Sequence, residues 1–247
     1  MNPTVLRMIR LFLFLIIVSP ALAFELPENS AQCVLGVASD WDSSKVRLSL
    51  HERDSSGRWK IVGTPWEGRL GKSGLSWGRG IHPVPTGSIM KKEGDWKAPA
   101  GVFRIGGAWG YGATVKKHPK LAYRQITTRD LWVEDSKSPS YNRHLILDRE
   151  PQSAWEKKQQ MRQNDYPHSL KLFIAHNEPP NATPGGGSAI FFHIWRGGGS
   201  KPTAGCTTMP EERLRQIIAW INPGENPLYV LLPESEYKRL RGEWRLP

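Results

Sequence analysis

The sequence of 247 residues lacks the features that mark several common classes of protein. Two cysteines are too few for a framework of several disulfides. The histidines are isolated and no group of His, Cys, Asp and Glu has metal-ligand spacing, so we expect no metal and no other cofactor. No internal repeat occurs, and no motif of a nucleic-acid-binding module accompanies the basic residues. We therefore expect one domain with no nucleic-acid partner.

Long apolar runs are also missing, except for one at the N-terminus. Two arginines precede the run from Leu11 to Val18, and Ala21-Leu22-Ala23 offers a small-x-small cleavage site. This pattern predicts a signal peptide at residues 1–23 and a single domain over residues 24–247. The run is short for a bilayer span, so an uncleaved anchor is the weaker interpretation. We expect an exported protein of the periplasm or cell envelope.

Positive charge is in excess, with 34 Lys and Arg against 23 Asp and Glu and a formal net charge of +11. For an exported protein, this balance favours an anionic partner such as the envelope surface, acidic glycopeptides or lipid head groups. The basic residues are scattered along the chain, so a merely soluble basic surface explains the charge equally well.

The two cysteines lie in different surroundings. Cys33 belongs to the apolar run from Gln32 to Val37, where a free cysteine behaves as a small buried hydrophobe, whereas Cys206 lies between glycine and threonines in a polar turn. An oxidising compartment permits a disulfide between them. Their different settings instead favour different roles for two free thiols.

Apolar patterning predicts many short strands and few helices. Strands are expected at residues 32–37, 46–52, 59–62, 170–175, 189–194 and 228–232. Residues 153–163 are expected to form one helix. A second helix is expected after a capping box at Thr208-Met209-Pro210-Glu211, because apolar residues then recur on one helical face as far as Ile221. The pattern predicts a β-rich α+β fold, a mixed sheet or sandwich with a few helices.

One segment combines a histidine with a cysteine. His193 ends an apolar run, a glycine-rich connection follows, and Cys206 lies just ahead of the second expected helix. A base beside a thiol, together with a helix N-terminus, favours the thiolate. Backbone N–H groups around Gly205 and Cys206 would stabilise an oxyanion. The alternative interpretation is a structural histidine and an unreactive cysteine.

The segment from Ala189 to Pro210 resembles the catalytic motif of the L,D-transpeptidase (YkuD-type) family, in the subgroup with Thr-Ala-Gly-Cys in place of Ser-His-Gly-Cys. Other stretches look like the same subgroup, and the likeness extends from about Gln32 to Pro233. These stretches are Gly71–His82, Glu93–Tyr111, Asp135–Arg143 and His176-Asn177.

The resemblance implies an L,D-transpeptidase-like fold and a cysteine acyltransferase that acts on peptidoglycan stem peptides. Cys206 would be the nucleophile, His193 its base, and Gly205 would allow the tight turn that shapes the oxyanion site. The acyl group of the third stem residue would pass to an amine of another stem and form a 3-3 crosslink. With water as acceptor, the same site would be an L,D-carboxypeptidase or a crosslink hydrolase.

The sequence departs from the family pattern at two positions. Ala204 stands where most members have a second histidine, and Thr208 stands where an arginine often follows. Arg196 is a candidate replacement for the missing cation, although a solvated loop arginine is the commoner explanation. His176 is a candidate for hydrogen bonding within the site, and a structural histidine explains it equally well.

The eleven tryptophans suggest a groove that packs sugars or stem peptides, although most tryptophans serve as core. Trp195 and Tyr111 are the candidates for contact with substrate. Sortase-like enzymes resemble this chain poorly, and NlpC/P60-type peptidases place the cysteine before the histidine. A noncatalytic cell-wall-binding module remains the alternative to an enzyme.

Overall fold

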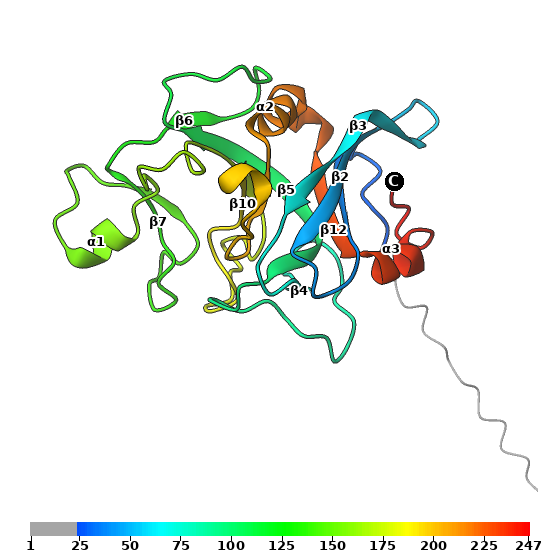
Figure 1. The fold of residues 1–247 in the computed structure, drawn as a ribbon, viewed down its shortest axis with the longest axis horizontal. Helices are drawn as coiled ribbons and strands as arrows, with labels where there is room; N and C mark the ends of the chain where they lie inside the picture. The colour runs from blue at the N-terminus through cyan, green and yellow to red at the C-terminus, as the bar shows by residue number, and fades with distance from the viewer. Residues whose placement is uncertain (1–23) are drawn as a thin grey trace, which may run out of the picture.

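The computed structural model describes residues 24–247, and the expected signal peptide at residues 1–23 lies outside the described residues. The described part contains twelve strands, three α-helices and two short 3-10 helices (Figure 1). The strands are β1 (Gln32–Ala38), β2 (Lys45–Arg53), β3 (Trp59–Arg69), β4 (Leu75–Trp77), β5 (Ala98–Gly110), β6 (Tyr123–Gln125), β7 (Asp130–Trp132), β8 (His144–Ile146), β9 (Leu170–Ile174), β10 (Phe191–Ile194), β11 (Thr207–Met209) and β12 (Leu228–Pro233). The helices are α1 (Ala154–Lys158), η1 (Gly197–Gly199), α2 (Glu211–Trp220), η2 (Pro223–Glu225) and α3 (Glu234–Leu240).

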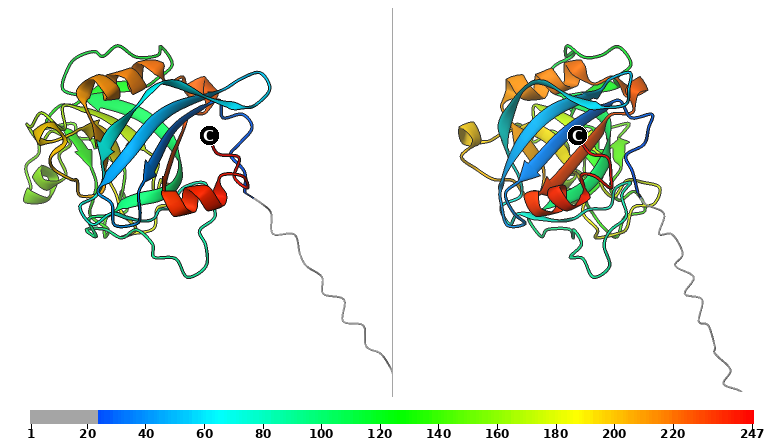
Figure 2. Two further views of the ribbon diagram at one scale, coloured as in Figure 1. Left: turned by 45° about the vertical axis from the view of Figure 1, so that its right-hand side comes forward. Right: turned by 90° about the vertical axis from the view of Figure 1, so that its right-hand side faces the viewer.

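Eight strands form a closed ring in the order β12-β1-β2-β3-β11-β10-β9-β5, because β12 also pairs with β5 (Figure 2). The pairings β1–β12 and β10–β11 are parallel, and the other six are antiparallel. The shortest strand pairing of the ring joins β11 to β3, where Thr208 and Arg69 form the single residue pair. The fold is β-rich with few helices, as predicted, but the expected sandwich is wrong.

The long strand β5 closes the ring. Its residues Gly101–Arg104 pair with β12, and residues from Ile105 to Gly110 pair with β9. The register shifts between Ile105 and Ala108, where two consecutive glycines remove the side chains that would resist a bend. Successive parts of β5 therefore pair with two different strands of the ring, β12 and then β9. The alternation of apolar residues does not predict this division.

The main core fills the interior of the ring. Phe192 on β10 has no exposed surface, and its ring lies 4.6 Å, centroid to centroid, from that of Tyr229 on β12. The hydroxyl groups of Tyr229 and Thr207 are 3.0 Å apart, which gives both buried groups a hydrogen-bond partner. The helix α2 covers one end of the ring and contributes Leu214, among others, to the same core (Figure 1). Interior packing therefore joins β10, β11 and β12.

We expect Phe192→Ala to lower the free energy of unfolding by about 3–5 kcal/mol, because it leaves a cavity against Tyr229. Urea denaturation followed by tryptophan fluorescence measures the change. Phe192→Leu keeps most of the volume and should cost under about 1.5 kcal/mol. Equal losses in the two variants would contradict tight packing at this position.

A second apolar cluster lies on the outer face of β9 and β10. The segment between β6 and β9, which includes α1 and the two-stranded sheet β7–β8, covers this face (Figure 1). The buried members of the cluster are Ile126, Trp132, Met161, Phe173, Ala175 and Phe191. Because successive residues of a strand alternate between faces, β10 sends Phe192 and Ile194 inward and Phe191 and His193 outward.

Both predicted helices are present, but their first or last residues differ from the prediction. Ser153 caps α1 with a complete capping box, but the helix ends at Lys158 and is shorter than expected. The helix α2 is present and buries its predicted apolar face, but the capping box at Thr208 is wrong, because Thr208 belongs to β11. Within residues 24–247, no helix has both the length and the apolar character needed to cross a membrane.

Candidate active site

The parallel pairing of β10 with β11 brings His193 and Cys206 to one face. Phe192 pairs with Thr207 and His193 with Thr208, so Cys206, just before β11, lies beside Phe191. The Phe191 N–H donates to Cys206 Sγ over 3.4 Å, and Sγ lies 3.4 Å from the Ala189 carbonyl oxygen that accepts from it. Both His193 and Cys206 line a cavity of about 660 Å³, called here the Cys206 cavity.

Asn142 holds the start of this segment. Its Oδ1 accepts from the Ala189 N–H at 3.0 Å and from Trp132 Nε1 at 2.9 Å, while its Nδ2 donates to the carbonyl oxygens of His176 and Asn177. Asn142 is buried. It therefore fixes the backbone of Ala189, whose carbonyl oxygen contacts the sulfur. The sequence stretch that contains Asn142 carried the family resemblance, but its role was not predicted.

His193 is 4% exposed, and its Nδ1 lies 2.8 Å from the carbonyl oxygen of Ile194. A carbonyl oxygen can only accept, so Nδ1 carries the proton and Nε2 keeps its lone pair. Burial lowers the pKa of His193 well below its ordinary value, and the neighbouring His168 acts in the same direction. The imidazole is therefore neutral at neutral pH and able to accept a proton.

Cys206 is a free thiol, as is the buried Cys33, so the alternative of a disulfide between them is wrong. Enclosure by protein raises the pKa of Cys206 to about 11, although the Phe191 N–H and Lys171 oppose the rise. The expected help from a helix N-terminus is absent, because β11 separates Cys206 from α2. The thiol therefore needs a proton acceptor before it can attack.

Gly205 forms the turn ahead of the cysteine. Its φ is +150°, and a Cβ at this position would lie 2.9 Å from the carbonyl oxygen of Lys97. The Gly205 N–H donates to Thr203 Oγ1 at 3.0 Å, and this hydroxyl donates to the Cys206 carbonyl oxygen at 2.7 Å. Glycine is thus required for the turn, as expected. Its amide already has a partner, which leaves the Cys206 amide as the candidate oxyanion donor.

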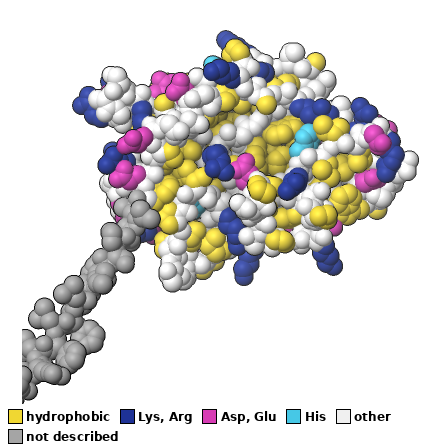
Figure 3. All heavy atoms as spheres, turned by 180° about the vertical axis from the view of Figure 1, so that it is seen from behind, with side chains coloured by type: hydrophobic (Ala, Val, Ile, Leu, Met, Phe, Trp, Pro, Cys, Tyr) yellow, Lys and Arg dark blue, Asp and Glu magenta, His cyan; other side chains and the backbone are white. Residues whose placement is uncertain are grey.

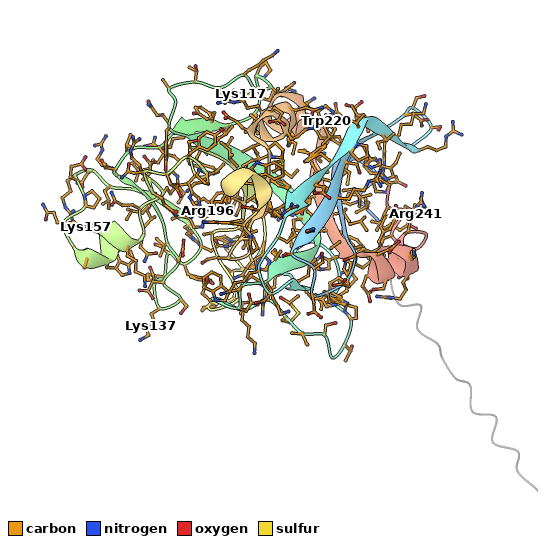
Figure 4. All side chains as sticks on the ribbon, in the orientation of Figure 1. Lys117, Lys137, Lys157, Arg196, Trp220 and Arg241 are labelled. Atoms are coloured by element: carbon orange, nitrogen blue, oxygen red, sulfur yellow. The ribbon has the colours of Figure 1, made fainter. Side chains whose placement is uncertain are left out.

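Of the two candidates on the loop after β10, only Arg196 lines the Cys206 cavity. It lies beside η1 (Figure 4), and its Nη2 is 2.8 Å from a carboxylate oxygen of Asp165. Trp195 lies instead in a separate groove with Tyr166 and packs against Gly199, which has no room for a side chain. Trp195 therefore lies outside the lining of the Cys206 cavity, and its contact with substrate stays a prediction.

His176 and Tyr111 also lie outside the lining of the cavity. His176 has no exposed surface, accepts from the Arg79 N–H at Nδ1 over 3.1 Å and donates from Nε2 to the Gly186 carbonyl oxygen over 3.0 Å. Tyr111 accepts from the Gln163 N–H, and Arg162 lies over its ring. Both residues hold loops in place, and their contact with substrate stays a prediction that this cavity does not support.

Sequence reasoning missed two residues that line the cavity, His168 and Lys171. The ring centroid of His168 lies 4.6 Å from that of His193, and His168 Nδ1 is 2.7 Å from Asp165. Lys171 pairs directly with His193 in the sheet and is 4% exposed. A lysine inside the apolar run from Leu170 to Ala175 was the available signal, because that run was predicted to be a buried strand.

The cavity carries a positive balance. Its lining contains five basic side chains, Lys72, Lys91, Lys171, Arg196 and Lys201, and two carboxylates, Glu93 and Glu134. Elsewhere, Lys and Arg side chains form separate groups on the face drawn in Figure 3, with uncharged surface between them. Among residues 24–247, no group of three or more His, Cys, Asp and Glu side chains could hold a metal ion.

The comparisons with known proteins agree with this geometry. The sequence model of the YkuD L,D-transpeptidase catalytic domain matches residues 69–230, a stretch that contains every residue lining the Cys206 cavity. Searches of curated proteins and of solved structures gave no match. The strands β1 and β2 precede the matched stretch, although they complete the ring. The chain belongs to the YkuD family of L,D-transpeptidase catalytic domains.

Proposed function

We propose that this protein is an exported cysteine acyltransferase that forms 3-3 crosslinks between peptidoglycan stem peptides. The observation that carries the proposal is the pairing, in one cavity, of a free thiol with a neutral imidazole whose Nε2 keeps its lone pair. The family supplies the reaction type and the substrate class. Export to the periplasm or envelope, and membership of the Thr-Ala-Gly-Cys subgroup, are parts of the same proposal.

The reaction begins with transfer of the Cys206 proton to His193 Nε2. The thiolate attacks the carbonyl carbon of the third stem residue, and a C–S bond forms while the carbonyl oxygen becomes an oxyanion beside the Cys206 amide. The C–N bond to the terminal D-amino acid then breaks, and His193 returns the proton to the leaving amine. An amine of another stem attacks the thioester and releases Cys206.

The charge of the cavity supports a stem peptide as substrate. Stem peptides carry free carboxylates, and the basic side chains of the lining outnumber its two carboxylates. A volume of about 660 Å³ fits a short peptide segment. The scattered surface charge also permits weak contact with an anionic envelope.

Two alternatives differ from this proposal in their products. Water in place of the acceptor amine would make the same thioester chemistry an L,D-carboxypeptidase or a crosslink hydrolase. A noncatalytic wall-binding module would bind the same peptides and leave them intact.

Incubation with defined tetrapeptide muropeptides, with and without an acceptor stem, tests the proposal. We expect release of the terminal D-amino acid and a 3-3 crosslinked dimer, both measured by chromatography with mass spectrometry. Tripeptide alone, even with excess acceptor, would establish the hydrolase instead. Binding to wall fragments with no product under any condition would establish the binding module.

A further inference from the structure

Lys171 is a buried cation without a carboxylate partner. Its side chain is almost fully enclosed, and the hydrogen bond recorded for Nζ goes to the carbonyl oxygen of Met161 at 2.9 Å. Among the described residues, no carboxylate oxygen lies within 4.0 Å of this ammonium group, which can donate three hydrogen bonds. A buried charge of this kind is costly unless an anion accompanies it.

The other charged groups of the cavity are already engaged or exposed. Lys91 pairs with Asp95, and Arg196 pairs with Asp165, which also contacts His168. Glu93 accepts hydrogen bonds from Tyr141 and Ser188. The remaining carboxylate, Glu134, and the lysines at 72 and 201 are exposed. Lys171 therefore differs from its neighbours in being both enclosed and unpaired.

The sheet places Lys171 on the same outer face as the sulfur, in the lining of the same cavity. It pairs with His193 across β9 and β10, on the outer face that also holds Phe191. Lys171 Nζ lies 5.7 Å from the centroid of the Phe191 ring, and the N–H of the same Phe191 donates to Cys206 Sγ. The ammonium group of Lys171 and the thiol of Cys206 thus lie near the same residue, Phe191, the first at its ring and the second at its backbone N–H.

We propose that Lys171 is the charge partner of Cys206, whose ammonium group stabilises the thiolate that forms when the thiol proton moves to His193. The assignment rests on the proposed function only in its consequence for turnover, since the thiol can ionise and react with a probe in the free protein. Lys171 acts through Cys206 and is a positioning residue. Its enclosure keeps water away from the pair, which strengthens the attraction.

The electrostatics of the pair are reciprocal. Burial lowers the pKa of Lys171 to about 8, and Cys206, Asp165 and Glu134 oppose this decrease. Lys171 in turn lowers the pKa of Cys206, as does the more distant Lys91, while Glu134 raises it. Burial lowers the pKa of the facing imidazoles of His193 and His168, so both are neutral at neutral pH and add little charge. The charge of Lys171 therefore supports the thiolate well below pH 8, is half lost near pH 8 and disappears above it, because Lys171 loses its proton.

The test is a pH titration of Cys206 alkylation by iodoacetamide, without substrate. Lys171→Met keeps the length of the side chain and removes the charge. Because Lys171 carries its charge well below pH 8, we expect alkylation of Cys206 at pH 7 to slow about tenfold in this variant, which is the effect of a one-unit rise in the pKa of the thiol. Lys171→Arg retains a permanent charge and should restore most of the rate. Lys201→Met, which removes an exposed charge from the same cavity, should leave the thiol pKa unchanged.

Thermal unfolding separates this role from a structural one. The Tm of Lys171→Met should be equal to or above that of the wild-type protein, because the substitution removes a buried unpaired charge. An unchanged thiol pKa in Lys171→Met would overturn the proposal and assign the lysine to a substrate carboxylate. An equal rise in the thiol pKa in Lys171→Met and in Lys201→Met would overturn it too, because the effect would then not be specific to Lys171. Absence of muropeptide products would count against the proposed function alone, because alkylation needs no substrate.

Discussion

Cys206→Ala is expected to abolish both crosslinked and trimmed products from tetrapeptide muropeptides, a loss of about 10⁴-fold or more in kcat/KM. The reason is that no acyl-enzyme can form without the sulfur. The other cysteine cannot replace it, because Cys33 is buried in the ring on β1 and burial raises the pKa of its thiol. Chromatography with mass spectrometry measures the products.

Cys33→Ala is the matched control for this experiment. It also removes a thiol, but from the core, and it should keep full activity at a modest cost in stability. Intact mass after treatment with a thiol probe should show one adduct on the native fold, at Cys206. Product formation by Cys206→Ala at more than a few percent of the normal rate would remove this cysteine from the role of nucleophile.

His193→Ala is expected to lower kcat/KM by about 10²–10⁴-fold, the usual contribution of a positioned general base. It should also slow alkylation of Cys206 near neutral pH, since the thiol has a raised pKa and loses the base proposed to take its proton. His118→Ala, on the loop between β5 and β6 and outside the cavity lining, is the control and should change neither rate.

The pH profile gives an independent check on His193. Because burial lowers the pKa of His193 far below its ordinary value, the imidazole is already neutral at pH 6. We therefore expect kcat/KM of the unchanged enzyme to show no rise with a midpoint near 6.5. A clear ascending limb at that pH would mean that the base is a more exposed histidine than His193.

Many of the strands could be predicted from the apolar runs of the sequence, but the closure of the ring could not. The apolar runs that became β1, β9, β10 and β12 are short and continuous, and each was recognised. The strand β5 is different, because its 13 residues pair with β12 over one half and with β9 over the other. Such pairing depends on long-range register and not on local composition.

Thr208 shows how tertiary structure can override a local signal. Threonine, proline and glutamate at the right spacing fit a capping box, yet Thr208 pairs with His193 and Arg69 as part of β11. The helix begins at Glu211, after Pro210, without a side-chain cap. Sheet pairing places Thr208 in a strand, and the helix starts only at Glu211. The motif therefore predicted the helix but not its first residue.

The candidate site could be predicted only where its residues are close in sequence. His193 and Cys206 are joined by a short connection, and their approach followed from strand geometry. His168 and Lys171 come from another strand and the loop before it, so their place in the cavity depends on the pairing of β9 with β10. His176 illustrates the converse: it lies near the end of β9 in sequence, but inside the protein and outside the lining of the cavity.

Within the ring, the pairing of β11 with β3 is the shortest, because it consists of one pair of residues. The other seven strand pairings close the remaining circumference. Cys206 lies immediately before β11, and Arg69, on β3, also donates to the Gly199 carbonyl oxygen of η1. Cys206 therefore lies beside the shortest strand pairing of the ring, and backbone hydrogen bonds of Thr203 with Leu70 and Lys72 hold its turn against the end of β3.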